Sequence, residues 1–428
     1  MKSIAKFYTW FWVIYFPVCI PFQKVVNYDF SDELLMIVLV FYTFFKSQYL
    51  VKSRRRLREV ATCYALLTFY LLYSFIIDIT TPRGIMLDFL QQIRPYSVFY
   101  LTWLLAPKFT KFQKKLIIFV MLASFFGYVI LFYTANRVVS YFGDGENAVM
   151  GQIALCCGMV YYLFSEHTKR NKYIALGIML LGLLSGKSKY IGECVVFFAL
   201  VIYIKRRIKF DSPKFILQMS ALAVAVLYFT WTKFNIYYVE NMQKEDSGYA
   251  RPETYKVAWR IITQDYIPFG TGYGTFGTIA AAKEYSPLYY KYGLNKIWGL
   301  EPENPMFLAD AFYPTLAQVG IFGIFFFVIF WKRRIQETNR ITDLYSYQMA
   351  LMAIMALALE STADTSYLSG KGMGYFMILA VCLNSNQRNA LIRIKKDESA
   401  DGGLCAAEQR GGGIGHPNDG TDATVARV

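Results

Sequence analysis

Long apolar stretches recur along most of this 428-residue chain, and short basic clusters separate them. A stretch of roughly 20 mainly apolar residues is long enough to cross a bilayer as one helix. Apolar residues make up 55% of the chain and aromatic residues 18%, which is more than a soluble core of this size needs. The pattern therefore predicts an all-α polytopic membrane protein with about 12 transmembrane helices.

The expected transmembrane helices divide the chain into four parts. Residues 1–231 hold nine of the helices, 232–310 form one large extracytoplasmic loop, and 311–396 hold the last three. The tail, 397–428, is rich in Gly, Ala and Asp, which predicts a disordered cytoplasmic segment. The twelve expected helices are 4–22, 33–50, 59–79, 92–106, 116–134, 149–165, 173–187, 190–204, 214–231, 311–331, 346–361 and 372–386.

The basic residues give the expected orientation. The net charge is +15, and the densest clusters, such as 52–58, 205–209 and 332–334, fall between alternate apolar stretches. The positive-inside rule places those clusters in the cytoplasm, with both termini on the same side. We therefore expect a multi-pass protein of the inner membrane whose loop 232–310 faces outward. Charge that is divided among short loops does not predict a nucleic-acid surface.

Several kinds of chemistry are not expected from the residue types present. The seven cysteines lie mostly in apolar stretches without a paired CxxC motif, so we expect neither disulfides nor a metal site. Only two histidines occur, His167 in an expected cytoplasmic loop and His416 in the tail. No Walker loop, zinc cluster or Ser–His pair is present, and we expect no cofactor.

Cations on the outward side are candidate site residues, because the positive-inside rule does not explain them. Lys187 and Lys189 lie between two expected helices, where either a hydrated hairpin or an anion site accounts for them. Arg83 is explained equally well by snorkelling of its side chain. Arg94 precedes Pro95 at the entrance of an expected helix and is the better candidate of the two arginines.

The outward loop adds two arginines and a carboxylate. On a helix that begins at Pro252, Lys256 and Arg260 share a face, which is either a solvated surface or part of a phosphate site. The planar fork of arginine suits phosphate oxygens, so Arg251 and Arg260 are candidates for binding a diphosphate. Asp310, at the end of the loop, is either a capping residue or a general base whose pKa is raised by burial.

Three segments in order resemble the O-antigen polymerase and O-antigen ligase superfamily of bacterial polysaccharide polymerases. Residues 251–262, followed by PFGTGYGTFG at 268–277, resemble its R…W…P.GxGxGxF signature. Residues 310–323, DAFYPTLAQVGIFG, resemble its loop-closing D/H-N…L..E.G..G pattern. Residues 184–190 look like its SRg hairpin, with lysines where arginine is usual. The resemblance covers about residues 1–396.

The resemblance implies a GT-C-like membrane glycosyltransferase that takes a glycan from undecaprenyl diphosphate at the outer face of the bacterial inner membrane, with no metal or nucleotide. It implies Asp310 and Arg260 as catalytic residues. Trp259, Tyr273 and Phe276 would form the glycan-binding part of the loop. The residues expected to bind the diphosphate are Arg94, Lys187, Lys189, Arg251 and Arg260.

Some residues depart from the family pattern. These departures favour one of the family's activities, while alternative functions remain. Ligases of this superfamily use a loop histidine near the position of Asp310, and its absence here favours a polymerase of lipid-linked repeat units. Gln318 stands where the family usually has an acid. The alternatives are an O-antigen ligase that acts on lipid A-core and a flippase for lipid-linked glycans, although no internal repeat supports a transporter.

Other classes of membrane protein fit less well. A membrane O-acyltransferase would need an intramembrane or outward histidine, and a structural scaffold would not need the glycine signature. The expected partners are the lipid-linked oligosaccharide, membrane lipid, a chain-length regulator and a flippase.

Overall fold

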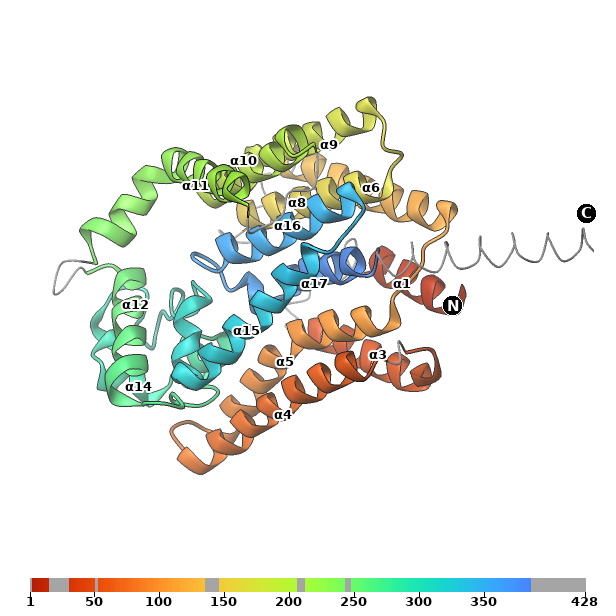
Figure 1. Ribbon diagram of the computed structural model, residues 1–428. Helices are drawn as coiled ribbons and strands as arrows, with labels where there is room; N and C mark the ends of the chain where they lie inside the picture. Colours follow the sequence, from red (N-terminus) through yellow and green to blue (C-terminus); the bar gives the residue numbers. More distant parts are fainter. Residues whose placement is uncertain are drawn as a thin grey trace, which may run out of the picture. The chain divides into compact units, whose positions relative to one another are not determined.

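The computed structural model describes residues 2–14, 31–50, 53–134, 146–205, 212–242 and 248–385. These residues are all-α, as expected, and the only β pairing among them is one isolated bridge between Glu301 and Asn304 (Figure 1). They belong, apart from Ser385, to one compact unit, Met1–Asn384. The expected tail 397–428 and parts of the expected helices 4–22 and 372–386 lie outside the described residues.

Longer helices make up most of the structure on either side of the loop region. Before the loop come α1 (Lys2–Ile14), α3 (Ser31–Phe45), η2 (Ser47–Tyr49), α4 (Arg54–Ile77), α5 (Pro82–Leu105), α6 (Lys111–Thr134), α8 (Glu146–Phe164), α9 (Lys169–Gly182), η3 (Leu183–Ser185), α10 (Ser188–Tyr203), α11 (Pro213–Phe234) and η4 (Asn235–Glu240). After it come α15 (Gly320–Thr338), α16 (Leu344–Glu360), η8 (Ser366–Leu368) and α17 (Gly370–Leu383).

Short elements build the loop region, which in the structure comprises residues 250–318. They are α12 (Ala250–Arg260), η5 (Ile261–Asp265), α13 (Ile279–Lys283), α14 (Pro287–Lys291), η6 (Leu294–Lys296) and η7 (Tyr313–Gln318). This region has its own apolar core, in which Ile261, Phe276 and Tyr289 are buried together with Leu300. The aromatic residues of the loop therefore stabilise a folded region, because buried rings supply large apolar area.

The expected fold with about 12 transmembrane helices is wrong. Among the described residues, only α4 is long and apolar enough to cross a membrane, by length and composition alone. The multi-pass placement in the inner membrane, with both termini cytoplasmic, and the GT-C-like arrangement are overturned by the same finding.

Part of the physical reason is that several apolar stretches in the sequence do not coincide with long helices. The stretch 311–331 is divided between η7 and α15, because Gly320 adopts a left-handed conformation between them. The stretch 372–386 becomes α17, which has only 14 residues. The stretch 92–106 is the second half of α5, whose first half carries Arg83 and Asp88.

The main core forms where α17 meets α5 and α16 (Figure 1). The sequence of α17 is apolar on nearly every side, as is typical of a helix that is surrounded by others. Its Phe376 contacts Phe99 of α5 edge-on and stacks against Trp331 of α15 at a tilt. This core fixes the end of α16, where the polar groups described next are located.

Candidate anion-binding and acid–base site

A cluster of charged side chains forms where α10 approaches the end of α16. Lys189 lies in the first turn of α10, and its Nζ is 2.9 Å from Glu360 Oε2 and 2.5 Å from Asp364 Oδ2. Glu360 ends α16 and Asp364 follows in the connection to η8. Lys189 is 171 and 175 positions from the two acids, so tertiary structure alone brings it to them.

Neutral donors complete this cluster from two further elements. Gln152 of α8 donates a hydrogen bond of 2.6 Å to Glu360 Oε2, and Ser366 of η8 donates one of 2.8 Å to the same oxygen. The Glu360 side chain is fully buried and that of Lys189 is 15% exposed. Burial works against the charge on Lys189, but Glu360 and Asp364 outweigh it and raise the pKa of the ammonium group above its ordinary value. Lys189 is therefore a stable cation at the edge of a buried network.

Arg251 and Asp310 form an ion pair beside this cluster. Arg251 lies in the first turn of α12, and its guanidinium contacts the Asp310 carboxylate. Asp310 lies close enough to Lys189 and Asp364 to interact with their charges. Burial raises the pKa of the Asp310 carboxyl group, and the neighbouring Arg251 lowers it by less. A carboxylate with a raised pKa is suited to accept a proton near neutral pH.

Two contacts dock the loop region at this place. The Tyr255 hydroxyl of α12 donates a hydrogen bond of 3.1 Å to the Thr362 carbonyl, just after α16. The Phe312 amide donates one of 3.0 Å to the Ser361 carbonyl. Segments on both sides of the Arg251–Asp310 pair are thus tied to the end of α16.

The structure brings together three of the residues that the sequence predicts for the site, Lys189, Arg251 and Asp310. Lys187 lies two residues before Lys189, on the turn that opens α10, and is partly buried. Arg94 is buried in α5 and pairs with Glu33 of α3.

Arg260 lies at the opposite end of α12 from Arg251. Nine residues of helix place the two arginines about 13 Å apart and on opposite faces. The Arg260 Nε is 3.2 Å from Asp265 Oδ2, its side chain is 60% exposed, and its guanidinium lies over the Tyr292 ring. The two arginines therefore do not converge in this structure.

The glycine motif at 268–277 holds the loop region against α4, α5 and η7. Gly270, Gly272 and Gly274 all have positive φ angles, which glycine adopts without strain. The Gly274 amide donates a hydrogen bond of 2.6 Å to Asp88 Oδ2, and the Tyr273 amide donates one of 2.6 Å to Ser74 Oγ. The motif thus serves close backbone packing, and through η7 it fixes the segment that follows Asp310.

The three predicted glycan-binding residues occupy different environments. Trp259 is 68% exposed at the end of α12. Tyr273 and Phe276 are buried, the first among the rings of Tyr70 and Phe89 and the second against Tyr289. Of the three rings, only that of Trp259 presents a face at the surface.

Four members of the cluster are not identified by reasoning from the sequence: Glu360, Asp364, Gln152 and Ser366. For Glu360 and Asp364 a signal exists, since Glu360 lies at the end of an apolar stretch and Asp364 shortly after it, as Asp310 precedes one. For Gln152 and Ser366 no signal exists, because only the fold shows that they face a buried carboxylate.

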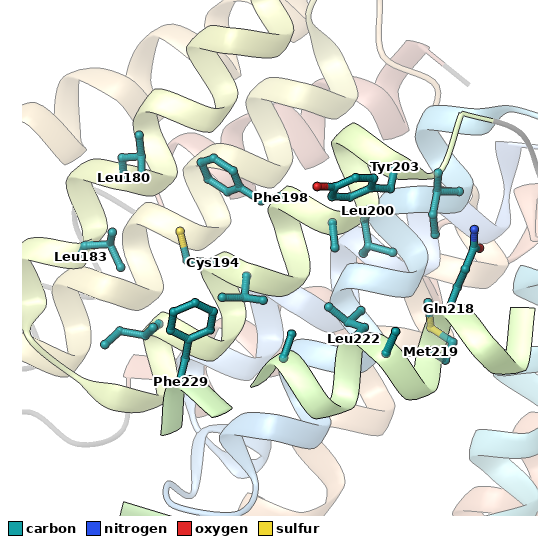
Figure 2. A pocket seen from close by; sticks show the side chains of 16 residues that line it. Leu180, Leu183, Cys194, Phe198, Leu200, Tyr203, Gln218, Met219, Leu222 and Phe229 are labelled. Carbon is teal, nitrogen blue, oxygen red and sulfur yellow. The ribbon is translucent and has the colours of Figure 1, made fainter. Parts of the chain in front are cut away.

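An apolar groove of about 570 Å³ lies between α9, α10 and α11. Figure 2 shows side chains from these helices around one space, among them Leu180, Phe198, Leu222 and Phe229. Lys189 and Glu193 share one face of α10, whereas the groove residue Ile191 lies on another. α10 therefore contributes Lys189 to the charged cluster on one face and a wall of the groove on another.

Comparison with known proteins adds no identification. No protein-family model matches this chain, and no curated protein matches it.

Proposed function

We propose that this chain is a glycosyltransferase that polymerises lipid-linked oligosaccharide repeat units, transferring the growing glycan from undecaprenyl diphosphate to a sugar hydroxyl. The observation that carries the proposal is the meeting of two cations, Lys189 and Arg251, with the carboxyl group of Asp310. A reaction that expels a diphosphate needs converging cations for the leaving group and a base for the attacking hydroxyl.

The proposed reaction assigns one role to each group. Asp310 takes the proton of the acceptor hydroxyl as its oxygen forms a bond to the anomeric carbon. The bond between that carbon and the diphosphate oxygen breaks, and its electron pair leaves with the diphosphate. Lys189 and Arg251 stabilise the charge that develops on the leaving group. Diphosphate oxygens and Asp310 compete for Arg251, so donor binding loosens the ion pair and frees the base.

The apolar groove supports a lipid-linked donor. Its lining is almost entirely apolar, with Leu180, Ile191 and Phe198 as examples. Lys187, on the turn between η3 and α10, is flanked in sequence by the groove residues Leu183 and Ile191. A long hydrocarbon chain matches an apolar groove of this kind.

The experiment uses a strain that lacks the chain and is complemented with variants of similar protein level. The deletion is expected to leave glycan of one repeat unit at most and to accumulate lipid-linked units. Arg251→Ala and Asp310→Asn are expected to lose polymer at least about 100-fold, since each removes a group that acts in the transition state. Arg260→Ala, on the opposite face of α12, is the matched control and is expected to retain polymer within about threefold.

Other outcomes distinguish the alternatives. Normal polymer in Arg251→Ala and Asp310→Asn would remove the charged cluster from catalysis. If the deletion strain makes full-length polymer on the lipid carrier that is never joined to lipid A-core, the activity is that of a ligase. If the repeat units accumulate on the cytoplasmic side, the chain is a flippase.

A further inference from the structure

A second charged pocket lies between the start of α4 and the basic end of α15. It has a volume of about 340 Å³ and is lined by Arg55, Arg58, Glu59 and Thr62 of α4 and by Arg333 of α15. The four α4 residues stand at positions i, i+3, i+4 and i+7, so they occupy one face of the helix. The pocket shares none of these residues with the Lys189 cluster.

The structure divides the basic run at 54–58 between two roles. Arg56 turns away from the pocket, donates a hydrogen bond of 2.9 Å to the Trp103 carbonyl and another of 3.0 Å to Asn384 Oδ1, and stacks on the Trp103 ring. Arg56 therefore holds α4 against neighbouring elements. Arg55 and Arg58 are exposed and line the pocket.

The pocket has an excess of positive charge. Its one carboxylate, Glu59, is already paired with Arg334, whose side chain is fully buried, and accepts a hydrogen bond of 3.3 Å from Tyr100. Arg333 Nη1 reaches Glu59 Oε2 only at 3.8 Å, and its side chain is 45% exposed. Within the described residues, the side chains of Arg55 and Arg58 form no ion pair. Three guanidinium groups are thus available to an anion that has several oxygens.

The pocket continues into a mainly apolar slot of about 100 Å³, which α5 and η7 line together with the same two helices. The slot shares Glu59, Thr62 and Arg333 with the charged pocket and then passes Leu66 of α4 and Phe330 of α15. The same face of α4 thus changes from basic to apolar along its length. An adjoining cationic mouth and apolar slot match a molecule that carries an anion at the end of a hydrocarbon chain.

We propose that this pocket binds an anionic lipid, with a phosphate headgroup held by Arg55, Arg58 and Arg333 and the adjoining part of a hydrocarbon chain in the slot. The arginine fork suits phosphate oxygens. A lipid fits better than a free phosphate because the apolar slot opens directly from the charged pocket. α4, the one described helix both long and apolar enough to cross a membrane, also begins at this pocket. The proposal does not depend on glycan transfer.

Binding of hexadecyl phosphate to the purified full chain in neutral detergent tests this proposal, with inorganic phosphate and hexadecyltrimethylammonium as comparison probes. Hexadecyl phosphate is expected to bind at least about tenfold more tightly than either probe. Arg58→Gln and Arg333→Gln are expected to weaken its binding about tenfold each, which is the effect of losing one charge-assisted hydrogen bond. Leu66→Ala should weaken binding of hexadecyl phosphate and leave that of inorganic phosphate unchanged.

Lys332→Gln is the matched control, since it removes a cation next to Arg333 that does not line the pocket, and binding should stay within about twofold. Arg58→Lys keeps the charge and the fold while losing the fork, and it should fall between wild type and Arg58→Gln. Wild-type affinity in Arg58→Gln and Arg333→Gln would overturn the proposal. Equal affinity for inorganic phosphate, with no effect of Leu66→Ala, would overturn the assignment to a lipid.

Discussion

Asp88 shows how one buried carboxyl group connects the glycine motif to the stability of the protein. Its side chain is fully buried and accepts the hydrogen bond from the Gly274 amide. Burial raises its pKa from 3.8 to about 6, and the hydrogen bonds that it accepts oppose this only in part. The folded protein therefore holds this proton more tightly than the unfolded chain does.

The sign of the resulting pH dependence follows from linkage. The stabilisation due to Asp88 is complete below pH 3.8 and is lost as the pH rises through about 6. Relative to Asp88→Asn, the wild-type free energy of unfolding should fall by on the order of 3 kcal/mol across this range. Chemical denaturation of both proteins at several pH values measures the difference. Parallel curves would show that Asp88 does not titrate in this way.

At the scale of single residues, the sequence identifies charges in unusual places but not their partners. Lys189, Arg251 and Asp310 are found in this way, and they do meet in the structure. Arg94 is selected by the same reasoning, yet it pairs with Glu33 on another helix. Nothing local distinguishes these cases, because the partner of each cation lies at least 50 residues away.

At the scale of elements, glycines differ according to what surrounds them. A Cβ added at Gly270 would lie 2.4 Å from the Ala317 carbonyl oxygen and 2.5 Å from the Gly320 nitrogen. Gly293 has a similar φ of +70°, but a Cβ added there meets nothing within 4 Å. Replacing either glycine costs free energy because another residue adopts a positive φ angle less easily. Only a substitution at Gly270 also produces a steric clash.

Gly293→Ala should therefore lower the free energy of unfolding by about 1 kcal/mol, which is the cost of a positive φ angle alone. Gly270→Ala should lower it by roughly 1–3 kcal/mol more, because backbone atoms have to move to relieve the clash. Thermal or denaturant unfolding of both variants measures this. Similar losses in the two would mean that the motif tolerates a side chain.

The sequence predicts helices where they occur but not where they end. The apolar stretch 173–187 corresponds to α9, which begins at Lys169 and ends at Gly182, where Tyr190 fills the space beside the glycine. An apolar stretch shows that a segment is buried or faces an apolar environment, and both cases have the same composition. Counting such stretches therefore predicted about 12 membrane-crossing helices, whereas one described helix meets the criterion.

At the scale of the whole molecule, the ion pair between Lys189 and Glu360 joins residues that are 171 positions apart. Replacing the lysine alone should leave Glu360 buried without a cation, which costs about 3–5 kcal/mol. Lys189→Met combined with Glu360→Gln should recover much of that loss. The matched control is Lys187→Met, which is expected to change stability by less than about 0.5 kcal/mol.

Urea unfolding of the wild type, Lys189→Met, Glu360→Gln and the combined variant closes this double-mutant cycle. If the two single substitutions change the free energy of unfolding by amounts that add up to the change in the double mutant, the two side chains do not interact. The sequence could not predict this pair, because neither local propensity nor hydrophobic pattern carries information about contacts between α10 and α16.

The tight backbone contacts around Gly270 and Gly274 also limit how this chain can vary over evolutionary time. At these two positions every other amino acid would place an atom within 3 Å of backbone. Homologues of this protein should therefore keep glycine at both positions. Gly248 and Gly293 also have positive φ angles, but a Cβ added at either position meets nothing within 4 Å. Asparagine, which tolerates a positive φ angle, can therefore replace glycine at these two positions.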